Sequence, residues 1–244
     1  MAKDVKGKAN EVDKKIAEIV AERVRTKGVR WLKKIGVSEN MLTALEKRVS
    51  KEEKREKIRE RPKLSPQEQR ILNAEFIEAA KRGDLTTMED LLDIGADITA
   101  KDNAQGRTAL ICASFDGHEE VVEFLIKLGA NVNATDKDGQ TAIIAAVNRG
   151  YKTIVESLIK HGADVNARNN DGETALIWNS HFGNMGIAEL LIKNGADLTI
   201  KDNHDATARE VAHLYGKYDM EEFLMKEEVK KEAEELLKKK SRKT

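Results

Sequence analysis

A 33-residue periodicity constrains the fold of this chain more than any other feature of its sequence. Two sets of residues keep that step, one of glycine and one of threonine: Gly117, Gly150, Gly183 and Gly216, and Thr108, Thr141, Thr174 and Thr207. Gly-Ala pairs begin at residues 95, 129, 162 and 195, so a single extra residue lies in the first interval. This spacing predicts that one supersecondary unit is copied along the chain and that its copies stack.

Each period has the same internal order. A polar turn is followed by a short segment that begins with Thr, a Gly break, a longer segment and a Gly-Ala pair. In the longer segments apolar residues fall at positions i, i+1, i+4 and i+5, as in Val121, Val122, Leu125 and Ile126. This pattern predicts a helix with one buried stripe. The Thr hydroxyl is expected to cap the shorter helix, a contribution of about 1 kcal/mol.

Residues 138–167 carry these signals most completely, with the sequence DGQTAIIAAVNRGYKTIVESLIKHGADVNA. This segment resembles an ankyrin repeat, and the resemblance covers about residues 71–225. It implies an all-α solenoid of five helix-turn-helix units with β-turn tips, in which the first and last units act as caps. The chain departs from the family pattern in two respects: the Pro and His of the Thr-Pro-Leu-His helix start are missing, and Asn179 stands where the family places a small Ala.

The flanking segments lie outside the resemblance. Residues 1–50 are predicted to be a basic amphipathic helical region, and residues 51–70 a charged linker or helix. Residues 226–244 are predicted to form an extended C-terminal helix that ends in a basic tail. Apolar stripes mark the two ends: Val12, Ile16, Ile19, Val20 and Val24 near the start, and Val229, Ala233, Leu236 and Leu237 near the end. The first stripe fits either docking on the first repeat or contact with another macromolecule.

Charge is distributed unevenly along the chain. The 43 basic and 43 acidic residues cancel overall. Residues 1–63 hold 20 basic and 11 acidic residues, a net charge of +9, and residues 226–244 hold 8 and 5, a net charge of +3. The remaining 15 basic and 27 acidic residues give the body −12. This distribution favours a cationic partner for the body, and nucleic acid or anionic lipid for the ends.

The sequence carries no motif for a catalytic, cofactor or metal site. It has no Gly-rich phosphate loop, no Gly-x-Ser-x-Gly elbow and no Cys/His pair at metal-ligand spacing. We therefore predict no catalytic residue, no cofactor and no bound metal. Cys112 is expected to be buried and inert, His118 to have a packing or surface role, and Trp178 to belong to the core.

The ankyrin resemblance implies a binding face made of the first helices and the turn tips. The first group of candidates comprises the pairs that precede each inter-helix Gly: Lys81 and Arg82, Phe115 and Asp116, Asn148 and Arg149, His181 and Phe182, and Leu214 and Tyr215. The second group lies in the turns: Arg107, Lys137, Asp138, Gln140, Asn170, Asp171 and Glu173. The alternative is that Phe115, Phe182 and Tyr215 pack onto neighbouring units instead of meeting a partner.

These observations predict a non-enzymatic adaptor, scaffold or inhibitor that binds a protein. The alternative function is binding of nucleic acid or an anionic membrane through the basic ends, with the repeats as a tether. No apolar run approaches the ~20 residues that span a bilayer, and the first residues, MAKDVKGK, lack the apolar stretch of a secretory signal. We expect a cytoplasmic protein, with a nuclear location as the alternative, and a monomer, with a dimer through the end helices as the alternative.

Overall fold

The computed structural model describes residues 64–241. The sequence predictions for residues 1–63 therefore lie outside the described residues. The chain divides into two compact units: the described part of one comprises residues 64–73 and 89–96, and that of the other residues 74–88 and 97–241. Within residues 64–241 the regular structure is helical, and three isolated β-bridges occur in the turns.

The helices follow one another in short pairs. The first four are α4 (Pro66–Arg82), α5 (Leu85–Ile94), α6 (Ala109–Asp116) and α7 (Glu119–Lys127). The next four are α8 (Ala142–Arg149), α9 (Lys152–Lys160), α10 (Ala175–Phe182) and α11 (Met185–Lys193). The last pair is α12 (Ala208–Leu214) and α13 (Tyr218–Ser241). The all-α architecture that the ankyrin resemblance implies is thus confirmed.

In the unit that comprises residues 64–73 and 89–96, a capping box opens α4. The Ser65 backbone N–H donates to Glu68 Oε2 at 2.7 Å, and the Glu68 N–H donates to Ser65 Oγ at 3.3 Å. These reciprocal bonds satisfy two backbone donors at the helix start. The Gln69 side-chain amide also donates to the Gly95 carbonyl at 2.9 Å.

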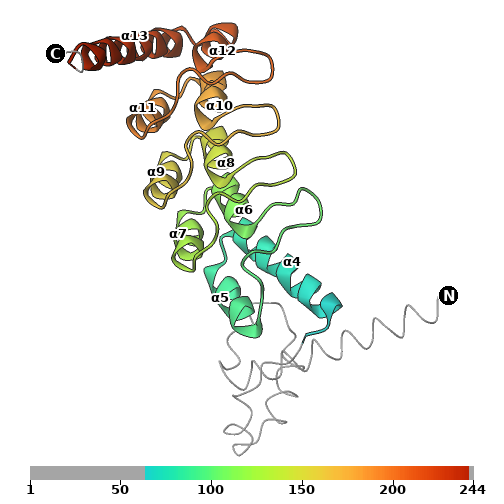
Figure 1. The fold of residues 1–244 in the computed structure, drawn as a ribbon. Coiled ribbons are helices and arrows are strands. Elements are labelled where there is room, and N and C mark those ends of the chain that lie inside the picture. The colour runs from blue at the N-terminus through green and yellow to red at the C-terminus, as the bar shows by residue number, and fades with distance from the viewer. Residues whose placement is uncertain (1–63, 242–244) are drawn as a thin grey trace, which may run out of the picture. The chain divides into compact units, whose positions relative to one another are not determined.

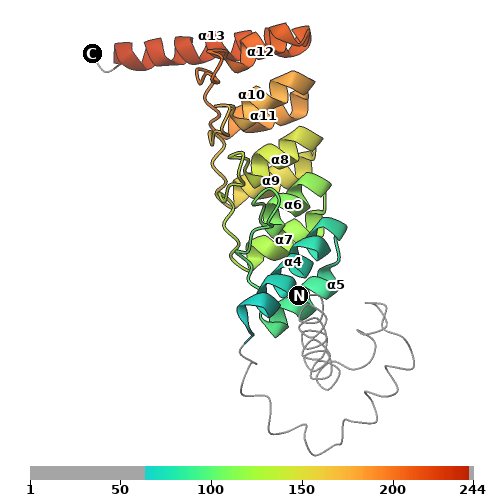
Figure 2. The same ribbon diagram turned by 90° about the vertical axis from the view of Figure 1, so that its right-hand side faces the viewer.

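In the unit that comprises residues 74–88 and 97–241, the helix pairs stack as layers. The first helices α6, α8, α10 and α12 form one column, and α7, α9 and α11 form a second beside it (Figure 1). Each turn projects from the first column on the side away from the second, so the first helices lie between the second helices and the turns (Figure 1). The residues that begin each first helix therefore lie at the bases of the turns, where Thr108, Thr141 and Thr207 form the three β-bridges (Figure 2).

The core of this stack lies between the layers. Val121, Val122 and Leu125 of α7 are buried, and Ile154, Val155 and Leu158 repeat the pattern in α9. Small residues of the first helices, such as Ala113 and Ala146, are fully buried and allow close approach of the neighbouring layer. These apolar positions, which the sequence pattern predicted to be buried, thus form the buried face of each second helix.

Threonine begins four of the first helices, and three of the four caps form as predicted. The hydroxyls of Thr108, Thr174 and Thr207 each accept from the backbone N–H three residues later. At Thr207 a reciprocal bond from the backbone to Glu210 completes a capping box. Thr141 differs, because its buried hydroxyl has no hydrogen-bond partner among the described residues. The prediction of a side-chain cap is therefore wrong for α8.

A carboxylate or amide closes each turn at its base. The Oδ1 atoms of Asp102, Asp136, Asn169 and Asp202 each accept at least two backbone N–H groups of the turn that follows. Successive turn tips are also joined by backbone bonds of 2.8–2.9 Å, from Lys137 N to Gln105 O, Asn170 N to Asp138 O, and Asn203 N to Asp171 O. The turns therefore form a continuous hydrogen-bonded edge of the stack.

The last helix is much longer than its counterparts. α13 has 24 residues, whereas α7, α9 and α11 each have nine. Two residues of α13 attach it to the stack. Glu228 Oε2 lies 2.9 Å from Nε of Arg209 in α12, and Lys231 Nζ donates to the Ala196 carbonyl at 2.8 Å. Beyond them the helix runs past the edge of the stack (Figure 2). Val229, between the two attached residues, is exposed, and so are Leu236 and Leu237 beyond them.

Candidate functional site

The residue pairs that precede each inter-helix turn form the candidate site, and we call them the helix-end pairs. They are Lys81–Arg82, Phe115–Asp116, Asn148–Arg149, His181–Phe182 and Leu214–Tyr215. α4, α6, α8, α10 and α12 position them, since each pair lies at or just after the last turn of its helix. Glycine follows every pair, and Gly117, Gly150 and Gly183 adopt the left-handed conformation that ends a helix.

Phe115 lies between two guanidinium groups. The Cζ atom of Arg149, from the next repeat, is 4.1 Å from the centre of the Phe115 ring, and that of Arg107, from the preceding turn, is 5.0 Å away. Arg107 also places its Nε 3.3 Å from Oδ2 of Asp136, whose side chain is fully buried. Phe115 is consequently half-buried, and the exposed group above it is Arg149.

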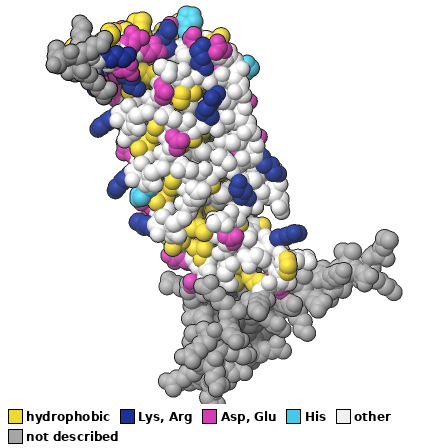
Figure 3. Space-filling model, viewed as in Figure 1, with side chains coloured by type: hydrophobic (Ala, Val, Ile, Leu, Met, Phe, Trp, Pro, Cys, Tyr) yellow, Lys and Arg dark blue, Asp and Glu magenta, His cyan; other side chains and the backbone are white. Residues whose placement is uncertain are grey.

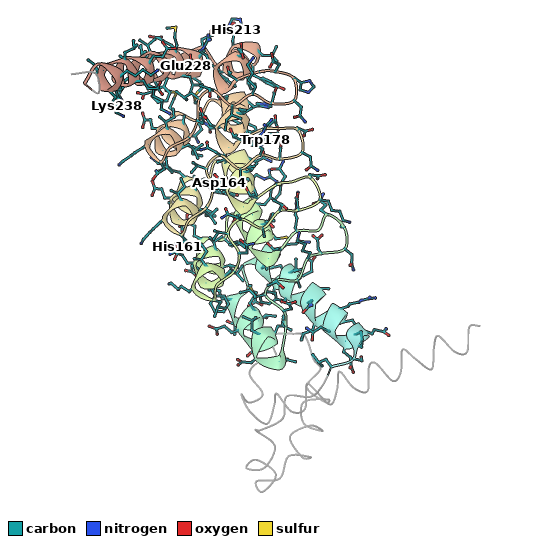
Figure 4. All side chains as sticks on the ribbon, viewed as in Figure 1. His161, Asp164, Trp178, His213, Glu228 and Lys238 are labelled. Atoms are coloured by element: carbon teal, nitrogen blue, oxygen red, sulfur yellow. The ribbon has the colours of Figure 1, made fainter. Side chains whose placement is uncertain are left out.

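His181 lies two repeats after Phe115, and aromatic side chains cover it. The Tyr215 ring stacks on it at a centroid distance of 4.4 Å, and the Trp178 ring lies 5.3 Å away. On a third side, His181 Nε2 lies 3.4 Å from Oε1 of Glu173. Glu173 Oε2 in turn accepts from Asn169 Nδ2 at 3.0 Å, so the imidazole is fixed in position. Trp178, predicted for the core, is half-buried and lies on the turn side of α10 (Figure 4).

Three apolar side chains of the last two repeats remain open to solvent. Phe182 is 51% exposed, Tyr215 52% and Leu214 76%. The Phe182 ring meets Trp178 edge to face at 6.5 Å, which supports it from below. Figure 3 shows acidic, basic and hydrophobic side chains interspersed over the face seen in that view. Exposed aromatic side chains held by their neighbours are well suited to contact with another protein.

The helix-end pair of α4 is engaged within its own helix. Lys81 Nζ lies 2.8 Å from Glu78 Oε1, and Arg82 Nη2 lies 2.7 Å from Glu75 Oε1. The Lys81 carbonyl pairs with His118 Nε2 at 2.7 Å, which agrees with the predicted packing role of that histidine. Asp116 is exposed, and Asn148 is half-buried.

The turn candidates separate into exposed and structural groups. Lys137 Nζ donates to the carbonyls of Asn103 and Ala104 in the preceding turn. Asn170 Nδ2 donates to the carbonyl of Lys137 at 2.8 Å. The residues predicted to contact a partner therefore also connect neighbouring turns. Of the other four turn candidates, Asp138 and Asp171 are exposed, Gln140 is half-buried, and Glu173 is buried.

Asp102 and Cys112, which lie near this face, have shifted pKa values. Burial raises the pKa of Asp102, but hydrogen bonds from the backbone of Gln105, Arg107 and Gly106 outweigh it and hold that pKa below its usual range. Burial raises the pKa of the Cys112 thiol to about 12. A thiol with such a pKa is almost entirely protonated at neutral pH, so the prediction that Cys112 is buried and inert agrees with its surroundings.

The part of the chain between residues 64 and 241 contains no group of three or more His, Cys, Asp and Glu side chains arranged to hold a metal ion. Within the same residues, no helix is both long and apolar enough to cross a bilayer. The site instead offers groups suited to non-covalent contact. These are the Arg149 guanidinium on the Phe115 ring and the exposed side chains of Phe182, Leu214 and Tyr215.

Sequence reasoning missed the residues that close the turns. Asp102, Asp136, Asn169 and Asp202 recur at steps of 34, 33 and 33, the same register as the Gly-Ala pairs. That periodicity could have identified them, since Asp and Asn commonly accept hydrogen bonds from backbone groups two or more residues later. Glu173, in contrast, occupies a turn position that is variable among the repeats and gave no signal of burial.

Comparison with known proteins agrees with this architecture. A family model for three copies of the ankyrin repeat matches residues 76–169, and a single-repeat model matches residues 171–203. The chain is also similar to ankyrin repeat domain-containing protein 29 of Danio rerio, with 45% identity over 64 residues. That alignment covers 26% of this chain and 21% of the relative, so the chain spans about a fifth of the length of the curated relative that it matches.

Proposed function

The chain belongs to the ankyrin-repeat family, whose repeats are generally protein–protein interaction modules, and we propose that it is a non-enzymatic adaptor, scaffold or inhibitor. Its partner binds the helix-end pairs and the exposed turn residues. The observation that carries this proposal is the exposure of Phe182, Leu214 and Tyr215 on one side of adjacent repeats. Large apolar side chains exposed side by side commonly mark an interaction surface.

The binding body in this proposal is residues 71–225. Residues 1–50, 51–70 and 226–244 flank it as the basic helical region, the charged linker or helix, and the C-terminal helix with its tail. We place the protein in the cytoplasm, with the nucleus as the alternative, and expect a monomer, with a dimer through the end helices as the alternative.

Affinity purification from the native cell, with mass spectrometry of what co-elutes, identifies a partner for the test. A variant with Arg149→Gln, Phe182→Ser and Leu214→Ser is then expected to lose that partner. The matched control changes three exposed residues of α9: Lys152→Ser, Glu156→Gln and Lys160→Gln. Circular dichroism should be unchanged in both. Retention of the partner by the first variant would count against this face.

The second candidate function rests on the basic ends. Lys239, at the exposed end of α13, together with the net charge of +3 for residues 226–244, favours contact with nucleic acid or anionic lipid. A salt titration of binding to double-stranded RNA and to vesicles with anionic lipid, with and without residues 1–63, tests it. Weak binding that is equal in both proteins would remove this candidate.

A further inference from the structure

We propose that Arg149 is the docking point for a carboxylate of the partner, and that Phe182, Leu214 and Tyr215 take an apolar residue of the same partner segment. This inference rests on the proposed function and gives its partner a chemical identity: a short segment in which Asp or Glu lies close to a large apolar residue. Two features of the structure support it. The first is the unpaired guanidinium of Arg149, and the second is the group of exposed apolar side chains in the last two repeats.

Arg149 differs from the other basic candidates because its side chain has neither an ion pair nor a hydrogen bond among the described residues. Lys81 and Arg82 are paired with glutamates, Arg107 is paired with Asp136, and Lys137 donates to carbonyl groups. Asp116, the exposed acid next to Phe115 in sequence, forms no ion pair with Arg149. The guanidinium of Arg149 is therefore available to a partner.

Stacking prepares this guanidinium for a carboxylate. With Cζ 4.1 Å from the Phe115 ring centre, one face of the group is covered while its N–H edge stays open. A carboxylate accepts two parallel hydrogen bonds from such an edge. The ring also restricts the long side chain before binding, which lowers the entropy that binding must remove. Arg107, on the same ring, is already paired with Asp136, so Arg149 is the guanidinium left for the carboxylate.

The apolar half of the site is equally constrained. Tyr215 is stacked on His181 at 4.4 Å, and Phe182 rests on the edge of Trp178 at 6.5 Å. His181 is fixed by Glu173 below it. An apolar partner residue that binds here covers exposed aromatic surface. Because Tyr215 and Phe182 are already held by neighbouring rings, binding orders them little further.

The two halves lie one repeat apart. Arg149 ends α8 and Phe182 ends α10, and these helices pack directly against each other. Packed helices have axes about 8–10 Å apart. An extended chain advances about 3.3 Å per residue. The Arg149 guanidinium lies over Phe115 of α6, two layers from α10, so the acidic and the apolar residue of an extended partner segment should be about three to six positions apart. This local preference differs from the cationic partner that the net charge of the whole body favours.

A random dodecapeptide library displayed on phage, selected against the full-length protein, tests the inference. Selected peptides are expected to carry Asp or Glu about three to six positions from Leu, Phe, Tyr or Trp. One selected peptide, labelled with fluorescein, should bind at least tenfold more weakly to the Arg149→Gln and Phe182→Ser variants by fluorescence polarisation. Arg149→Lys should give an intermediate loss, because it keeps the charge and loses the planar fork. Lys160→Gln, an equal charge change on exposed α9, should change binding less than twofold.

A charge swap completes the test. Peptide binding lost in Arg149→Glu should return when the acidic residue of the peptide is replaced by Lys. Selected peptides that lack an acidic residue and bind Arg149→Gln as well as the original protein would overturn the inference, while the proposed face survives if they still require Phe182. Peptides that bind every variant equally would overturn both, and so would a selection that enriches no peptide.

Discussion

The Cζ atom of Arg149 lies 4.1 Å from the ring centre of Phe115, a residue of the preceding repeat. This contact assigns different roles to two aromatic residues that occupy similar places in the sequence pattern. Phe115 is half-buried and packs between repeats, whereas Phe182 is 51% exposed. Their substitutions should separate stability from binding.

Phe115→Ala is expected to lower the free energy of unfolding by about 1–2 kcal/mol, because it removes partly buried area and two cation–π contacts. Phe182→Ala should change that free energy by less than about 0.5 kcal/mol, as expected at an exposed position. Urea unfolding followed by circular dichroism measures both. Equal losses in the two variants would show that Phe182 is also a packing residue.

Asp136→Ala should be among the costlier turn substitutions. The carboxylate is fully buried, accepts two backbone N–H groups and pairs with Arg107. Its removal leaves those donors without a partner, and we expect a loss of about 2–3 kcal/mol in the free energy of unfolding. Asp136→Asn should cost about 1 kcal/mol, because a neutral acceptor remains. Asn169 already makes the same two backbone bonds one repeat later, which supports that smaller value. Denaturation of both variants at pH 7 checks the order, and it would be contradicted by equal losses.

The predictable and unpredictable parts of this structure follow from the range of the interactions involved. The glycine and threonine registers identified helix starts and ends because those positions depend on local backbone conformation. The stacking of Tyr215 on His181 and the burial of Glu173 depend on how far one repeat is rotated against the next, which no local pattern encodes. The missing cap at Thr141 belongs to the same class, since the sequence around it matches that of the capped repeats.

Asp102 should contribute to the acid sensitivity of the fold. Its pKa is held below the unfolded value, so the unfolded chain takes up the proton first and stability falls as pH drops from about 4 through the lower pKa of the folded state. Asp102→Asn keeps an oxygen acceptor but cannot titrate. The variant should therefore lose less unfolding free energy than the original protein between pH 5 and pH 3. Urea titrations at the two pH values measure this, and an unchanged difference would indicate that other carboxylates dominate.

Cys112 should react slowly with thiol reagents in the folded protein. The side chain is buried, and burial raises its pKa to about 12, so both access and the thiolate fraction are small at pH 8. Labelling with Ellman's reagent should be at least a hundredfold slower in buffer than in 8 M urea. Because the unfolded thiol ionises near pH 8.5, its contribution to stability should be lost as pH rises above that value. Rapid labelling in buffer would contradict the burial of Cys112.

Gly117 and Gly129 provide a matched pair for the effect of close packing on a turn. Both have left-handed backbones, with φ of +85° and +84°. A methyl group at Gly117 would lie 2.5 Å from Cζ of the Tyr151 ring, whereas one at Gly129 would meet nothing within 4 Å. Gly129→Ala should therefore cost only the conformational term of about 1–2 kcal/mol. Gly117→Ala adds displacement of the tyrosine ring, and we expect at least about 1 kcal/mol more. Chemical denaturation of the two variants gives the difference directly. If Tyr151→Ala in the Gly117→Ala background restores the Gly129→Ala value, the ring is the cause; an undiminished loss would place the cost in the backbone alone.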